Sequence, residues 1–286
     1  ALTSFTGLLN FEEALYVGAI LAFSSTTIVI KILSDKNATS TLNGRIMIAI
    51  LLVQDFLIII FVPLLAEIGL LADPLFIPSI LGKSILLILI GIFANKIIFP
   101  RLFRVAEKES ELFLLSSIAT AFAFIVVSEL LGIPASIGAF IGGLALSTLP
   151  YNLEIFSQIR ALRDFFITIF FVSLGAELSF SFGTLPVALM VIIFAMIFLI
   201  KPFIIFMMTL VAGYGSKTGV KVGISLGQVS EFGFILAAIG STAIGASGAA
   251  IISQDLFSFL ITAIALSMII TPYLTTNSSW IAQNIY

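Results

Sequence analysis

The sequence contains no cysteine and no histidine, and only 10% of its 286 residues are charged. The absence of cysteine excludes disulfides, thiol nucleophiles and thiolate metal sites. The absence of histidine removes the side chain that ordinarily titrates near neutral pH, so a proton carrier here must be a carboxylate or a lysine. Soluble domains carry about 25% charged residues. A hydrophobic content of 60% and a mean hydropathy of +1.25 therefore indicate an all-α polytopic membrane protein.

Several other classes lose support from the same composition. The net charge is −2 and no basic run is present, so nothing favours a nucleic-acid partner. There is no H-E-x-x-H motif and no glycine-rich phosphate loop, which makes an enzyme the least favoured class. We expect neither a bound metal nor a cofactor. No basic segment precedes an apolar one at the N-terminus, so we expect no signal peptide and interpret the chain as part of a longer protein.

A membrane-spanning helix needs about 20 mostly apolar residues. Nine segments meet that description approximately: 12–33, 44–66, 79–99, 111–131, 134–149, 164–181, 184–212, 218–244 and 255–274. If the loops are assigned to the two sides in turn, one side receives all but two of the 13 cationic residues. The exceptions are Lys83 on the other side and Lys201 inside a span. Cytoplasmic loops are enriched in Lys and Arg, so we expect the N-terminus of the chain outside and its C-terminus in the cytoplasm.

Two charged residues lie at the middle of predicted spans. Gln54 and Asp55 occupy the centre of "GRIMIAILLVQDFLIIIFVPLL", and Lys201 occupies the centre of "FLIKPFIIF". At 1.5 Å per residue, Asp55 is roughly 15 Å along the helix from Arg45, near the midplane of a bilayer core about 30 Å thick. A charge there costs roughly 2.5–3.5 kcal/mol on insertion scales. A purely structural Asp55–Lys201 pair is the main alternative to a function.

Two polar clusters interrupt apolar helices at the same depth. The first is Ser24 to Thr27, in "AFSSTTIVIK", and the second is Gly227 to Glu231, in "GQVSE". Either cluster alone could simply bond back to the helix or permit close packing. Together, in helices of opposite direction, they are typical of inverted-repeat transporters, in which two broken helices cross near the midplane. The ends of half-helices carry partial charges that a nearby acid or lysine can compensate.

Five motifs in order resemble the second monovalent cation:proton antiporter family, and among its branches the Kef-type potassium:proton antiporters. They are "AFSSTTIVIKIL…GRIMIAILLVQD", "GIPASIGAFIGGLALS", "FFVSLGAELSF", "GQVSEFGFIL" and "ALSMIITP". The resemblance implies a sodium/proton-antiporter-like inverted-repeat fold with two crossing discontinuous helices, in which this chain supplies nine of about thirteen helices. It also implies a homodimer and, in a longer chain, a cytoplasmic nucleotide-binding regulatory domain beyond residue 286.

The resemblance further divides the helices of a single transmembrane domain, residues 1–286. Core-type helices fall at about 12–66 and 164–244, and dimerisation or linker helices at about 79–149 and 255–274. The stretch "YNLEIFSQIRALRD" has only Glu154 and Asp164 as acids. We therefore do not expect the glutathione gating that an acidic loop gives some members. The membrane is expected to be a prokaryotic-type inner or plasma membrane.

Matched by motif, Asp55 is the residue expected to bind either a dehydrated cation or a proton. Residues expected to surround the ion are Gln54, Ser25 and Thr26. Residues expected to support the crossing are Lys201, Glu231, Gln228 and Ser230. A single acid favours electroneutral exchange of K⁺ for H⁺. Na⁺/H⁺ exchange, a passive ligand-gated cation channel, and a membrane anchor or sensor without transport remain open alternatives at this point.

Overall fold

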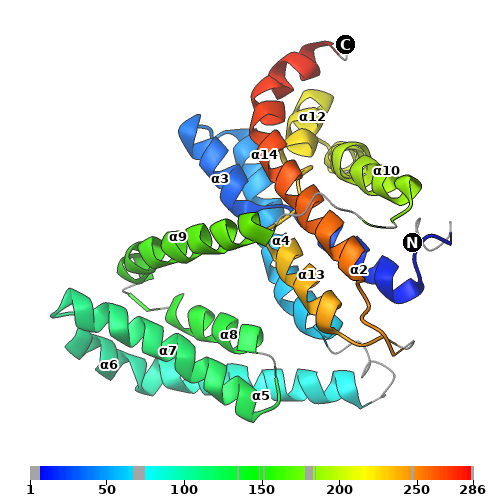
Figure 1. The fold of residues 1–286 in the computed structure, drawn as a ribbon. Helices are drawn as coiled ribbons and strands as arrows, with labels where there is room; N and C mark the ends of the chain where they lie inside the picture. The colour runs from blue at the N-terminus through cyan, green and yellow to red at the C-terminus, as the bar shows by residue number, and fades with distance from the viewer. Residues whose placement is uncertain are drawn as a thin grey trace. The chain divides into compact units, whose positions relative to one another are not determined.

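The computed structural model describes residues 7–66, 75–133, 135–147, 149–150, 152–177, 183, 185–245 and 248–284. The chain divides into two compact units: Ala1–Ala66 with Leu178–Tyr286, and Glu67–Glu177. The described parts of both are helical apart from their connections and one isolated β-bridge between Ile244 and Ala250 (Figure 1).

The first unit contains both polar clusters and both midplane charges. Its elements are α2 (Phe11–Ala22), α3 (Thr26–Asp35), α4 (Leu42–Ala66), α10 (Val187–Ala195), the π-helix η2 (Met196–Ile200), α11 (Lys201–Val211), α12 (Ser216–Ser225), α13 (Phe232–Thr242) and α14 (Gln254–Asn284). Helix α13 packs on α2 and on α14, and α12 packs on α11 and α14. Because α2 and α3 stand where one helix was expected, and α12 and α13 where another was, this unit contains two interrupted helices.

The second unit consists of α5 (Phe76–Ile97), α6 (Phe99–Ala106), α7 (Ser110–Leu130), α8 (Ala135–Ser147) and α9 (Asn152–Glu177). Helices α7 and α8 lie side by side (Figure 1). They approach closely at Gly138, where a Cβ atom would lie 2.5 Å from the carbonyl oxygen of Phe124. A small residue at this position therefore allows the two helices to pack closely.

The boundaries of several predicted spans differ from the structure. Among the described residues, four helices are long and apolar enough to cross a membrane: Phe11–Asp35 across its break, Ser110–Leu130, Val187–Val211 and Gln254–Ser278. A fifth arises if Leu81–Ile97 and Phe99–Ala106, bent by 52°, are counted as one span. Helix α8, with 13 residues, is only about 20 Å long and falls short of a 30 Å core. Several apolar spans are therefore present, and the total of nine remains a prediction.

Two further boundaries correct the sequence prediction. Helix α9 begins at Asn152 rather than near 164, so the "YNLEIFSQIRALRD" stretch is helical from its second residue. The reason is that Ile155 and Ile159, four residues apart, both pack against the apolar core of the second unit, which gives this polar stretch one buried face. Helix α14 continues past 274 to Asn284 and passes through Pro272. In the division into compact units it belongs with the two interrupted helices.

Candidate functional site

The first break separates α2 from α3 at Phe23–Ser25. Phe23 (φ −89°, ψ 148°) and Ser25 (φ −73°, ψ 115°) are extended, so the helical hydrogen-bond ladder stops for one turn. Helix α3 restarts because Ser25 is its N-cap, whose Oγ accepts the backbone N–H of Ile28 at 3.4 Å. Within the "SSTT" segment, Ser25 therefore caps α3, and backbone groups of the break remain available to other partners.

The second break, residues 226–231 between α12 and α13, lies directly against the first. The backbone N–H of Ser230 donates to the Phe23 carbonyl at 3.0 Å. The Ser24 hydroxyl donates to the Leu226 carbonyl at 2.7 Å. The amide nitrogen of Gln228 donates to the Ser25 carbonyl at 3.2 Å. Each break thus supplies the hydrogen-bond partners that the other has lost, although about 200 residues separate them in the sequence.

Lys201 joins the two breaks from a third helix. Its ammonium donates to the carbonyl of Phe23 at 2.7 Å and to that of Gln228 at 2.6 Å. The π-helical turn Met196–Ile200 immediately precedes it, and Pro202 follows it. Single π-turns inside a helix re-aim the residues beside them and are frequent at functional sites. The close approach of α12 depends on Gly223, where a Cβ atom would lie 2.5 Å from the Pro202 carbonyl oxygen.

Gln54 and Asp55 contact the first break from helix α4. The Gln54 Oε1 atom accepts the backbone N–H of Ser24 at 3.1 Å. The Asp55 Oδ2 atom accepts the Thr26 hydroxyl at 2.9 Å. The other carboxylate oxygen, Oδ1, accepts no hydrogen bond from the described residues. Asp55 as a whole is partly exposed.

Asp55 and Lys201 do not pair in the described part of the chain, where the ion pairs within 4.0 Å are Lys31–Asp35 and Arg163–Asp164. The ammonium of Lys201 is bound to two backbone carbonyls instead. The structure thus brings the two midplane charges to the same crossing, yet it gives each a different partner.

Glu231 lies where α13 begins and also contacts the other interrupted helix. Its Oε1 atom accepts the Thr27 hydroxyl at 3.0 Å, and its Oε2 atom is 3.5 Å from the Ser230 hydroxyl. The N-terminus of a helix carries a positive partial charge. Glu231 sits at the N-terminal ends of α13 and α3, and Asp55 also sits at that end of α3. The acids therefore face N-termini, whereas Lys201 faces carbonyls at the opposite ends.

Comparison with known proteins agrees with this arrangement. Residues 1–276 match the family described as "Sodium/hydrogen exchanger, transmembrane". The chain belongs to the sodium/hydrogen exchanger family. The prediction made from the motifs is confirmed, as is the expectation of a transporter-family membrane protein rather than an enzyme.

Individual relatives of this exchanger-family chain have names that refer to potassium. It is 29% identical over 274 residues to "K(+) efflux antiporter 4" of Arabidopsis thaliana, a match that covers 93% of this chain and 45% of the relative. It is 29% identical over 277 residues to the "Glutathione-regulated potassium-efflux system protein KefC" of Cronobacter sakazakii, covering 93% and 43%. A "Putative K(+) efflux antiporter KefB" of Alkalimonas amylolytica is 29% identical over 261 residues, covering 87% and 39%. The chain spans less than half the length of these relatives.

Sequence reasoning missed one contributor to the exchanger-family crossing. Ser267, on α14, is fully buried, and its Oγ accepts the N–H of Val229 at 3.1 Å. It falls inside the "ALSMIITP" motif, which was the available signal. Gln228 was expected at the crossing, and its amide oxygen is buried and has no hydrogen-bond partner in the described chain. A buried acceptor left free is costly, so it is the kind of group that a water or a cation would satisfy.

Proposed function

We propose that this chain is the membrane part of a monovalent cation:proton antiporter that exchanges K⁺ for H⁺, with Asp55 as the group that carries either. The observation on which the proposal rests is the state of Asp55 at the crossing: one carboxylate oxygen accepts from Thr26, the other accepts no hydrogen bond from the described residues, and the residue is partly exposed. Family membership and the names of the potassium relatives support the choice of reaction.

The exchange follows from competition at one carboxylate. A cation requires the carboxylate ionised, and a proton removes that charge, so the two ligands exclude each other. The Thr26 hydroxyl donates its hydrogen to Asp55, so the lone pairs of the Thr26 oxygen remain available to a dehydrated cation. Oxygen ligands of this kind replace the hydration shell of K⁺ in channel filters. Gln54 and Ser25 serve the site by holding the break, since their side-chain oxygens accept backbone N–H groups.

Coupling arises from the cost of moving an unoccupied carboxylate. A bare charge at the centre of the membrane is unfavourable by several kcal/mol, about 2.5–3.5 on insertion scales. The core therefore changes its accessible side only when Asp55 holds H⁺ or K⁺. One acid carries one charge of either kind, so the exchange is electroneutral. The proposed motion is of the elevator type, with the interrupted helices moving as one body because their hydrogen bonds hold them together.

The remaining parts of the proposal concern the whole protein. The interrupted pairs α2–α3 and α12–α13, each beside a long helix with one midplane charge, form the two halves of an inverted repeat. The protein is a homodimer, and the C-terminus of this chain leads to a cytoplasmic regulatory domain in the full-length form. The membrane is a prokaryotic-type plasma membrane, with the N-terminal end of the chain outside.

The decisive experiment replaces Asp55 by Asn in the full-length protein reconstituted in vesicles. A K⁺ gradient should move protons through the wild type and should fail to do so in Asp55→Asn. The matched control is Asp35→Asn, since Asp35 is exposed and pairs with Lys31 away from the crossing. Potassium-driven proton movement that persists in Asp55→Asn would contradict the proposal. Repeating the assay with Na⁺, Rb⁺ and Li⁺ decides between potassium and sodium, and uphill cation movement driven by a proton gradient excludes a passive channel.

A further inference from the structure

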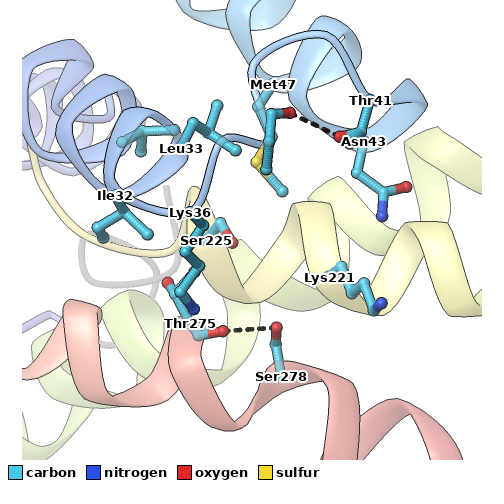
Figure 2. Close-up of a pocket in the computed structure, with 12 residues that line it drawn as sticks. Ile32, Leu33, Lys36, Thr41, Asn43, Met47, Lys221, Ser225, Thr275 and Ser278 are labelled. Carbon is cyan, nitrogen blue, oxygen red and sulfur yellow. Dashed lines mark hydrogen bonds between the residues drawn. The ribbon is translucent and has the colours of Figure 1, made fainter.

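An open cavity of about 230 Å³, lined by both apolar and polar side chains, lies within the first unit between α3, α4, α12 and α14. Its polar lining residues are Lys36, Thr41, Asn43, Lys221, Ser225, Thr275 and Ser278, and the rest of its lining is apolar. Figure 2 shows Lys36 extending toward Thr275, with Ser225 close by, while Lys221 and Asn43 lie farther off on the opposite side. None of the residues expected to bind the transported ion lines it. One water occupies about 30 Å³ in the liquid, so this cavity has room for a polyatomic group.

The charge of the cavity is positive. Lys36 and Lys221 line it, and no acidic side chain does. The nearest acid along α3, Asp35, is paired with Lys31 at 2.9 Å. Lys36 uses one donor on the Thr276 hydroxyl at 3.3 Å, which leaves others free because an ammonium has three. Two lysines without a countercharge repel K⁺ and attract an anion.

Two hydroxyl groups at the cavity have no partner. Ser225 is only 2% exposed, and its Oγ makes no hydrogen bond in the described chain. The Oγ1 atom of Thr275 is likewise buried and unpartnered. Ser and Thr in helices ordinarily bond back to a carbonyl one turn earlier, as Ser267 and Thr271 do on α14. Buried hydroxyls that forgo this bond point to a ligand that would accept from them.

The N-terminus of α4 adds a further positive feature to the cavity. Helix α4 is 25 residues long and begins at Leu42, beside the cavity residue Asn43. The Thr41 hydroxyl accepts the N–H of Gly44 at 3.1 Å, which caps only one of the first backbone donors. A helix N-terminus with free N–H groups favours phosphate and similar anions.

From these features we infer that the cavity is a binding site for a phosphate-type oxyanion, separate from the cation site at Asp55. Lys36 and Lys221 neutralise the anion, and the hydroxyls of Ser225 and Thr275 donate to its oxygens. The phosphate group comes either from an anionic lipid headgroup or from a soluble phosphate compound, since both present the same oxygens. A ligand in this cavity ties α3, α4, α12 and α14 together.

The test uses the full-length protein, delipidated in neutral detergent. Its thermal unfolding is followed during titration with inorganic phosphate against chloride at constant ionic strength and K⁺ concentration. In a second arm, retained phosphatidylglycerol is counted by native mass spectrometry. A saturable rise in melting temperature with phosphate assigns a soluble ligand, and retained lipid without such a rise assigns a headgroup. In either case Lys221→Gln should weaken binding at least tenfold, because a charge-assisted hydrogen bond is lost.

Lys217→Gln is the matched control, since Lys217 lies one turn earlier on α12, is exposed and does not line the cavity. Ser225→Ala should weaken binding about fivefold, as expected for a neutral hydrogen bond, without changing the melting temperature of the ligand-free protein. The inference is overturned if neither phosphate nor phosphatidylglycerol binds. It is also overturned if Lys217→Gln reduces binding as much as Lys221→Gln.

Discussion

Replacing Lys201 by Met tests what holds the two breaks together. The change removes both donors of the ammonium while keeping a long apolar side chain. The Phe23 carbonyl still accepts from the N–H of Ser230, at 3.0 Å. The Gln228 carbonyl loses the only donor that it has among the described residues. The second break should therefore loosen more than the first.

The size of the effect follows from two opposing terms. Two hydrogen bonds to a charged donor contribute about 1.5–3 kcal/mol each. Removing the charge from the membrane interior recovers roughly 2.5–3.5 kcal/mol. The two bonds together contribute about 3–6 kcal/mol, so with both opposing terms at mid-range the net loss for Lys201→Met is about 1–2 kcal/mol. For a protein of this size about 2–4 °C is lost per kcal/mol. We expect a melting temperature lower by about 2–8 °C in the detergent-solubilised full-length protein.

Hydrogen exchange measured by mass spectrometry gives the local readout. In Lys201→Met, peptides covering 226–231 should exchange faster, and peptides covering 23–25 should change less. Lys217→Met, which alters an exposed lysine on α12, should leave both the melting temperature and the exchange unchanged. If Lys201→Met melts at or above the wild-type temperature with unchanged exchange at 226–231, Lys201 does not hold the crossing and the reasoning fails.

Three further outcomes can be measured on the same protein. Gly223→Ala should lower the free energy of unfolding by about 1–3 kcal/mol, because the added Cβ would lie 2.5 Å from the Pro202 carbonyl oxygen. Gly18→Ala, where a Cβ would have no neighbour within 4 Å, should be neutral or stabilising by up to about 1 kcal/mol. Equal effects of the two substitutions in denaturant titrations would contradict this prediction. Tyr16→Phe should cost about 1 kcal/mol in the same titrations, since it removes the 2.5 Å hydrogen bond to the Leu65 carbonyl, and an unchanged midpoint would contradict it. If one carboxylate serves both ligands, as we propose, the K⁺ concentration for half-maximal flux should rise as pH falls while the maximal rate stays unchanged. A fall in maximal rate alone would count against competition.

The positions of both breaks could be predicted from the residue types around them. Ser and Thr compete with a helix for its backbone bonds and favour caps, so the Ser24 to Thr27 cluster in a long apolar run indicated an interruption, and the extended residues are Phe23 and Ser25. The Gly227 to Glu231 cluster carried the same signal, and α12 ends at Ser225. The depth of Asp55 followed from the fixed rise of a helix.

The partners of these residues could not be predicted, because they are set by packing between distant segments. From the sequence alone, Lys201 could either stabilise the crossing or pair with Asp55. The fold decides between these two roles, because it places the ammonium against the carbonyls of Phe23 and Gln228, which are 178 and 27 residues away in the sequence. The π-helical turn before Lys201 leaves no local mark except Pro202, whose missing N–H is compatible with several distortions. The early start of α9 was missed because its buried face depends on the second unit's core.

The separate partners of Asp55 and Lys201 bear on how the site works. Had the two charges paired, each arriving ion would have had to displace an ammonium, and removing one partner of a buried pair costs about 3–5 kcal/mol. In this structure Lys201 is satisfied by backbone carbonyls, and among the described residues Asp55 accepts a hydrogen bond only from the Thr26 hydroxyl. In the mechanism that we propose, the lysine therefore remains fixed and stabilises the crossing throughout, while the carboxylate exchanges one small ligand for another. On that proposal, the separate partners of the two charges allow a rigid crossing to contain a site whose ligand exchanges.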